Sequence, residues 1–167
     1  MHYSKIIKRD FANGPGVRVS LFVSGCSRQC PGCFNSEAWD PNFGKEFTKE
    51  TIEEILNSID DKCEGLSLLG GDPLESCNLN DVYNLILAFR DKFGYDKTIW
   101  LWTGYDAEFL VNDPLRARIV NAIDVLVDGP FIEEKKDLSL AFRGSSNQRI
   151  IDIRASQYFS TMILKDI

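Results

Sequence analysis

The sequence predicts an α/β protein whose parallel sheet forms an open partial (β/α) barrel, in a single domain over residues 1–167. Hydrophobic spacing alternates along the chain between the period of two typical of strands and the period of 3.6 typical of helices. A length of 167 residues with 44% apolar content suits one domain with its own core. Strand–helix–strand units in series build a parallel sheet, and this length is too short for the eight units of a closed barrel.

The first predicted unit begins with a strand over residues 17–24, a run rich in β-branched and apolar residues. This strand leads directly into a cysteine-rich loop. Thr48 is expected to cap a helix, because apolar residues repeat at i, i+3, i+4 and i+7 from Ile52 to Ile59. A buried strand over residues 66–69 then completes the unit.

The second unit consists of a helix that starts at Asn78 or Asn80 and a strand over residues 98–102. Apolar residues recur on one face of this helix as far as Phe93. The strand carries Trp100 and Trp102, which alternation places on the same side of the sheet. We expect both indoles to belong to the core.

A third unit contains a helix with Pro114 in its first turn, followed by a strand over residues 125–127. A further strand is expected over residues 150–153. The segment 155–167 is apolar for a tail. It either covers the edge of the sheet or contributes to a partner interface.

The loops that follow the strands are expected to form one site, because ligands of open parallel sheets bind beyond the carboxyl ends of the strands. Any one glycine turn has an ordinary backbone explanation, but several together with a cysteine loop favour a shared site. Gly70 and Gly71 would let the amino or carboxylate group of a ligand approach the main chain, and Asp72 could face a ligand ammonium. The loops in question span residues 26–33, 70–73, 103–106 and 128–130.

The cysteine loop has the spacing C-x3-C-x2-C, formed by Cys26, Cys30 and Cys33. Three thiolates can hold three irons of a four-iron cluster and leave the fourth iron without a protein ligand. Electron carriers usually close every iron, so an open iron predicts catalysis rather than electron transfer alone. Gly32 follows a proline and permits the tight turn that brings in the last thiolate.

Two other interpretations of the cysteines are weaker. A structural zinc site needs four ligands, and the only histidine of the chain is His2. A disulfide framework does not fit an odd count of five cysteines without a signal peptide. We therefore expect Cys63 and Cys77 to be inert. A non-catalytic metal-binding module stays an alternative. Metal analysis would distinguish the two, because the enzyme would contain iron and sulfide and the module zinc.

Composition excludes several classes of partner. A formal charge of −6 without a block of lysine and arginine argues against binding to nucleic acid. The apolar runs fall far short of the roughly 20 residues that span a bilayer, so no membrane association is expected. Free cysteines without an export signal indicate a reducing cytoplasm.

These residues resemble the radical S-adenosylmethionine superfamily, through the cysteine motif and the Gly-Gly-Asp-Pro turn at residues 70–73. Within that superfamily the chain is similar to the small glycyl-radical activating enzymes of anaerobic ribonucleoside-triphosphate reductases. The resemblance covers almost the whole chain, with matching motifs at residues 13–18, 22–26, 70–74, 100–105, 127–131 and 143–148.

The resemblance implies a radical-SAM type of partial barrel and two cofactors, a 4Fe-4S cluster and S-adenosylmethionine. S-adenosylmethionine would chelate the open iron and be cleaved reductively to a 5′-deoxyadenosyl radical, which would take a hydrogen from a glycine Cα of the reductase. The implied partners are the reductase and a reduced flavodoxin-like electron donor. Such chemistry needs no general acid or base, which agrees with the scarcity of histidine.

The resemblance also implies roles for individual residues. The three cysteines of the motif would be the metal ligands and the catalytic residues. The expected contacts to S-adenosylmethionine are Gly32, Cys33, Phe34, Gly70, Gly71, Asp72, Thr103 and Asp128.

An alternative within the superfamily is a small-molecule enzyme similar to 7-carboxy-7-deazaguanine synthase. That function would need convergent polar groups at the open end of the barrel, whereas an activase needs an opening wide enough for a peptide loop.

Overall fold

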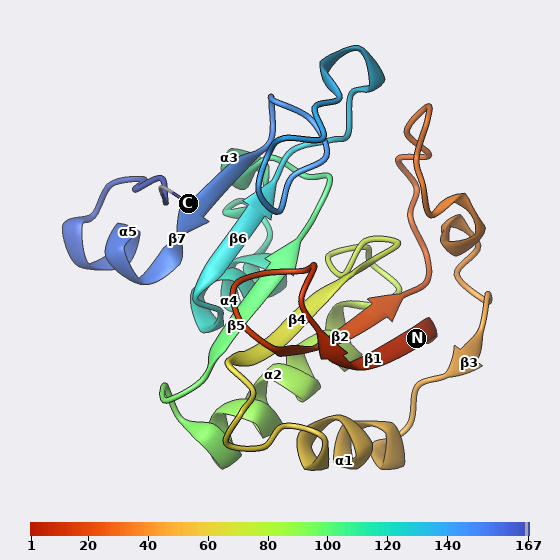
Figure 1. Ribbon diagram of the computed structural model, residues 1–167, viewed down its shortest axis with the longest axis vertical. Coiled ribbons are helices and arrows are strands. Elements are labelled where there is room, and N and C mark those ends of the chain that lie inside the picture. Colours follow the sequence, from red (N-terminus) through yellow and green to blue (C-terminus); the bar gives the residue numbers. More distant parts are fainter. Residues whose placement is uncertain (166) are drawn as a thin grey trace.

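One seven-stranded sheet runs through the computed structural model, which describes residues 1–165 and 167 (Figure 1). Its strand order is β3-β1-β2-β4-β5-β6-β7. The core strands β2 (Arg18–Val23), β4 (Gly65–Gly70), β5 (Thr98–Trp102) and β6 (Val125–Asp128) are parallel to one another. The predicted parallel sheet is confirmed for these strands, and its curvature into an open partial barrel stays a prediction.

The outer strands are antiparallel and were largely missed by the sequence pattern. β1 (His2–Asp10) pairs with β2 and with the short β3 (Lys45–Glu46). Two register shifts interrupt the pairing of β1 with β2, so its side chains lack the strict alternation that predicts a strand. At the other edge, β7 (Arg149–Asp152) pairs with β6.

The expected strand at residues 150–153 is shifted by one residue. Ile153 does not end β7 but begins the helix α5 (Ile153–Phe159). The carboxylate of Asp152 caps this helix by accepting the N–H of Ala155 at 2.9 Å. A local capping interaction therefore ends the strand earlier than the apolar run alone indicates.

The three predicted helices are confirmed as α1 (Lys49–Asn57), α2 (Leu79–Phe93) and α4 (Pro114–Ala122). Thr48 caps α1 through a reciprocal capping box with its N3 residue. Asp113 caps α4, where proline occupies the first turn. The remaining helical segments are α3 (Ala107–Leu110) and two 3-10 turns, η1 (Ser36–Trp39) and η2 (Glu133–Lys135).

The main core lies between one face of the sheet and these three helices. Alternate strand residues such as Leu68 and Leu101 meet Leu85 and Ile86 of α2, and all four are fully buried. Burying one such side chain contributes about 1.5–3 kcal/mol. The apolar faces of the helices and the alternating apolar residues of the strands therefore form the two sides of one interface.

The opposite face of the sheet holds a smaller cluster around Trp100, which confirms that this indole is core. Beside it, the buried guanidinium of Arg18 donates to the hydroxyl of Ser67 and to the carbonyl of Leu66. Burial lowers the pKa of Arg18 to about 10. Since Ser67 in turn donates to the carbonyl of Asn13, this cluster fixes the loop between β1 and β2 over the sheet.

No helix in the described part of the chain is long and apolar enough to cross a bilayer.

Candidate functional site

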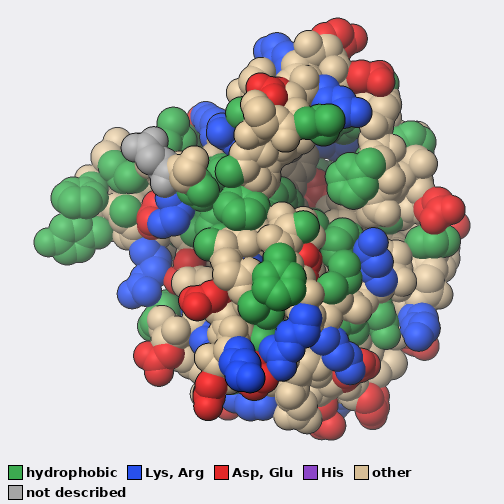
Figure 2. Space-filling view, viewed as in Figure 1, with side chains coloured by type: hydrophobic (Ala, Val, Ile, Leu, Met, Phe, Trp, Pro, Cys, Tyr) green, Lys and Arg blue, Asp and Glu red, His purple; other side chains and the backbone are tan. Residues whose placement is uncertain are grey.

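The loops after the core strands and the segment between β6 and β7 enclose a cavity of about 550 Å³. In the space-filling view the surface is hollowed between the segment that joins β6 to β7, at the top, and the cysteine loop to its right (Figure 1, Figure 2). The sequence-predicted residues that line this cavity are Cys26, Gly32, Cys30, Cys33, Phe34, Gly70, Gly71, Asp72 and Thr103. The structure thus brings together nearly the whole predicted site.

A second depression, of about 570 Å³, lies at the turn between α2 and β5. None of the predicted site residues lines it. It is lined by residues 92–97 and Asp61, and we attach no function to it.

The cysteine loop starts where β2 ends and is fixed there by backbone hydrogen bonds. The N–H of Gly25 donates to the carbonyl of Ala38 at 2.8 Å, and the N–H of Cys26 donates to that of Trp39 at 3.1 Å. Farther along, the N–H of Cys33 donates to the carbonyl of Cys30 at 3.1 Å and closes a tight turn. The turn contains Gly32, whose φ of 72° favours glycine, as expected from the sequence.

The three thiols of the motif are partly exposed on one wall of the cavity. Burial raises the pKa of Cys26, so a metal or a nearby cation has to favour its thiolate form. In the described residues, no set of three or more His, Cys, Asp or Glu side chains converges closely enough to hold a metal ion as it stands. The structure thus places the three thiols on one wall of the cavity without a closed metal site.

The donor set nevertheless fits an iron–sulfur cluster better than zinc. The cavity wall in the described residues includes the three motif cysteines and neither histidine nor another cysteine. Cys63 is buried elsewhere and accepts a hydrogen bond from Arg9. Cys77 is exposed and does not line the cavity. Three accessible thiols without a fourth ligand suit a cluster with one open iron rather than a closed zinc site.

The Gly70-Gly71 turn has a structural cause that the sequence did not indicate. Gly70 has a φ of +117°, and a Cβ there would lie 2.5 Å from the carbonyl oxygen of Val23. A Cβ on Gly71 would lie 2.6 Å from the carbonyl oxygen of Gly25. These glycines let the end of β4 lie directly against the backbone that enters the cysteine loop.

The carboxylate of Asp72 joins two of the loops. It is buried and accepts hydrogen bonds from the N–H of Leu74, the hydroxyl of Thr103 and the N–H of Gly104, at 2.8–2.9 Å. Burial outweighs these bonds and raises the pKa of Asp72 to about 6. Its oxygens already have protein donors, so the carboxylate is better placed to align the loops than to meet a ligand ammonium.

Asp128 does not line the cavity, and Gly129 takes that place on the wall. The buried carboxylate of Asp128 accepts hydrogen bonds from Arg149 and from the N–H of Ala107. This geometry gives no support to the expected contact between Asp128 and a cofactor. Phe34, in contrast, is 90% exposed at the rim.

Several cavity residues were not predicted as site residues from the sequence. Arg28, Lys136 and Arg143 line the cavity, and none of them has a salt bridge within the described part of the chain. Trp102, expected in the core, is half-buried and reaches the same cavity, where its indole N–H donates to the carbonyl of Phe142. The sequence offered only two signals for these residues. Arg28 lies within the cysteine motif, and Arg143 begins the polar segment at residues 143–148.

Comparison with known proteins gives consistent results. A family model described as a 4Fe-4S single cluster domain matches residues 12–151. A protein of Escherichia coli strain K12, named anaerobic ribonucleoside-triphosphate reductase-activating protein, is 43% identical over 157 residues, which cover 92% of this chain and 100% of the relative. Proteins of the same name match from Vibrio cholerae, with 44% identity over 90% of this chain and 97% of the relative, and from phage T4, with 39% identity over 90% and 93%.

Proposed function

The chain belongs to the family of anaerobic ribonucleoside-triphosphate reductase-activating proteins. We propose that it is a radical S-adenosylmethionine enzyme that installs a glycyl radical on such a reductase. Its cofactors are a 4Fe-4S cluster and S-adenosylmethionine. Its partners are the reductase and a reduced flavodoxin-like electron donor, in the cytoplasm.

One observation carries this proposal: Cys26, Cys30 and Cys33 share a cavity with the Gly70-Gly71 edge. The volume of about 550 Å³ lies within the range of about 300–1,000 Å³ usual for small-molecule sites. A ligand seated there would therefore contact the metal-binding loop and the ends of the neighbouring strands together.

The residues around the cavity have different roles in the proposed reaction. The three thiolates hold three irons, and Gly32 and the Gly70-Gly71 edge let a ligand approach the main chain. Asp72 and Thr103 keep two cavity loops in register through their hydrogen bonds. A cluster held there by Cys26, Cys30 and Cys33 would supply, once reduced by the electron donor, one-electron reductive cleavage of S-adenosylmethionine and so hydrogen-atom abstraction from a glycine of the partner.

The rim of the cavity favours a peptide over a free small molecule as the second substrate. Phe34 is 90% exposed and Leu138 is 88% exposed, and both line the cavity opening. Exposed apolar residues at such an opening can contact a protein segment. This supports activation of a partner protein rather than synthesis of a modified purine precursor.

The test is anaerobic reconstitution with iron and sulfide, followed by reduction, addition of S-adenosylmethionine and quantification of 5′-deoxyadenosine. We expect product from the wild type and a loss of at least about 100-fold in Cys30→Ala, because the cluster loses one of its three protein ligands. Cys77→Ser is the matched control, since it removes an exposed cysteine outside the motif and should leave product formation unchanged.

Addition of the reductase then distinguishes an activase from an enzyme that acts on a small molecule. A glycyl radical seen by electron paramagnetic resonance on the reductase would support the activase. Cleavage of S-adenosylmethionine that leaves no radical on the reductase would instead favour the small-molecule enzyme. Bound zinc in place of iron, with no 5′-deoxyadenosine, would overturn the proposal.

A further inference from the structure

The segment between Cys26 and Cys30 is tied to the rest of the chain at two points. The N–H of Ser27 and its hydroxyl both donate to Oε2 of Glu75, at 2.8 and 2.7 Å. The guanidinium of Arg28 lies 4.5 Å from the centre of the Tyr105 ring. In the described residues, no other hydrogen bond joins residues 27–32 to a residue outside the loop 26–33.

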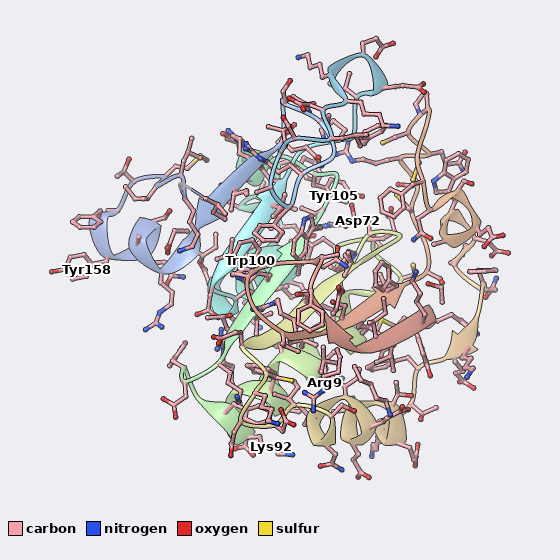
Figure 3. The ribbon with its side chains drawn as sticks, in the orientation of Figure 1. Arg9, Asp72, Lys92, Trp100, Tyr105 and Tyr158 are labelled. Atoms are coloured by element: carbon pink, nitrogen blue, oxygen red, sulfur yellow. The ribbon has the colours of Figure 1, made fainter. Side chains whose placement is uncertain are left out.

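The two contacts converge, because the hydroxyl of Tyr105 donates to Oε1 of Glu75 at 3.3 Å. Glu75 follows β4 and Tyr105 follows β5, so the cysteine loop after β2 is held by both neighbouring loops. Figure 3 shows Tyr105 near Asp72, toward the ends of these strands that face the hollow.

The receiving surface is itself fixed. The Tyr105 ring stacks on Phe109 with centroids 5.3 Å apart, and the guanidinium of Arg116 lies 5.2 Å from the same ring. Arg116 is buried and donates to the carbonyl of Leu74 at 2.9 Å. The loop is therefore held against side chains that packing already orders.

The carboxyl group of Glu75 is ionised, which strengthens its hydrogen bonds to the cysteine loop. Partial burial opposes its charge, but the hydrogen bonds from Ser27, together with those from Ser76 and Tyr105, outweigh burial and lower the pKa of Glu75. The bonds from Ser27 thus reach an ionised acceptor at neutral pH. Charge-assisted bonds of this kind are roughly twice as strong as neutral ones.

We propose that Glu75, together with Tyr105, is a clamp that holds Ser27 and Arg28 and so positions Cys26 and Cys30 for metal binding before the metal arrives. The identity of the metal group as a 4Fe-4S cluster rests on the proposed function. The clamp itself rests on the contacts of the chain alone. Glu75 acts as a positioning residue, since it reaches the metal ligands only through the loop.

The first test uses the full chain without iron and follows hydrogen–deuterium exchange of residues 26–33. In Glu75→Ala we expect the Ser27 amide to exchange at least about tenfold faster than in the wild type, because a hydrogen bond to a charged acceptor exceeds the 1.4 kcal/mol equivalent to a factor of ten. Glu53→Ala is the matched control, because Glu53 is an exposed glutamate of α1. It should leave exchange in this loop unchanged.

The second test uses protein reconstituted with iron and sulfide and measures the rate of iron loss to a chelator, with the cluster reduction potential. Glu75→Ala should lose iron several-fold faster. Glu75→Gln, which keeps an acceptor oxygen but no charge, should show intermediate iron loss and a raised reduction potential. If Glu75 only stabilised the fold at a distance from the cluster, Glu75→Gln would leave the reduction potential of the cluster unchanged.

Wild-type exchange and wild-type iron retention in Glu75→Ala would overturn the clamp. If Glu75→Ala does not fold, Ser27→Ala and Tyr105→Phe each remove one bond and should still accelerate exchange in the loop; wild-type exchange in both would also overturn it. Failure of the proposed function has a different signature. The wild type would then give no 5′-deoxyadenosine, while loop exchange would still depend on Glu75.

Discussion

At the scale of the residue, Asp72 shows how a site residue can act without facing a ligand. Sequence position alone indicated a charge offered to a ligand ammonium. In the structure its oxygens accept hydrogen bonds from Leu74, Thr103 and Gly104, which belong to two different loops. The turn at residues 70–73 therefore contributes its backbone to the cavity and this side chain to loop alignment.

We predict that Asp72→Ala lowers the free energy of unfolding of the iron-free chain by about 1–3 kcal/mol, because the buried N–H of Leu74 and the partly buried N–H of Gly104 lose their acceptor. Urea unfolding would measure the change. Asp96→Ala is the control, since Asp96 is exposed and its carboxylate has no hydrogen bond among the described contacts. Equal stabilities of the two variants would contradict the structural role of Asp72.

At the scale of the element, Arg149 joins three segments that the sequence pattern treats separately. From β7 it binds the buried Asp128 at the end of β6 and reaches Glu108 in α3 at 2.8–2.9 Å. The hydrogen bonds from Arg149 hold the pKa of Glu108 at about 2, well below its usual value of 4.5. Asp128, predicted as a cofactor contact, is thus occupied in fixing the antiparallel edge.

The sign of the pH dependence follows from this lowered pKa. The contribution of Glu108 to stability is present above pH about 4.5 and is lost as the pH falls toward about 2. Because Glu108 is largely exposed, we expect Glu108→Gln to cost at most about 1 kcal/mol at pH 7. Unfolding measured from pH 7 to pH 2 should show the two proteins converging below pH 4.5, and a constant or growing difference would refute the ion pair.

At the scale of the whole molecule, the helices α1, α2 and α4 cover one face of the sheet, while loops cover the other. The tail after α5 returns to the open edge of the sheet. The N–H of Asp152 donates to the carbonyl of Ile163 at 2.9 Å, and the N–H of Lys165 donates to that of Ile150 at 2.8 Å. Of the two roles expected for the tail, protection of the sheet edge has direct support, while Tyr158 points away from the body (Figure 3).

Removal of residues 161–167 should expose the backbone of β7 as an unprotected edge strand. We expect a loss of about 1–3 kcal/mol in the free energy of unfolding, from two backbone hydrogen bonds, and an increased tendency to self-associate. Thermal unfolding and light scattering would measure both. Tyr158→Ala, a change at a side chain that is 83% exposed, should stay within about 0.5 kcal/mol of the wild type. A truncated chain that is as stable and as monodisperse as the wild type would exclude edge protection.

Features that depend on near neighbours in the chain could be predicted from the amino-acid sequence. The helices α1, α2 and α4 and the core strands followed from periodicity and capping, and the candidate cysteine site followed from the spacing of Cys26, Cys30 and Cys33. Which polar side chains face the cavity depends on contacts between distant parts of the chain. The bonds of Asp72 to Thr103, of Asp128 to Arg149 and of Ser27 to Glu75 join residues 31, 21 and 48 positions apart. No local pattern records such pairs, because their geometry exists only once the sheet has brought the loops together.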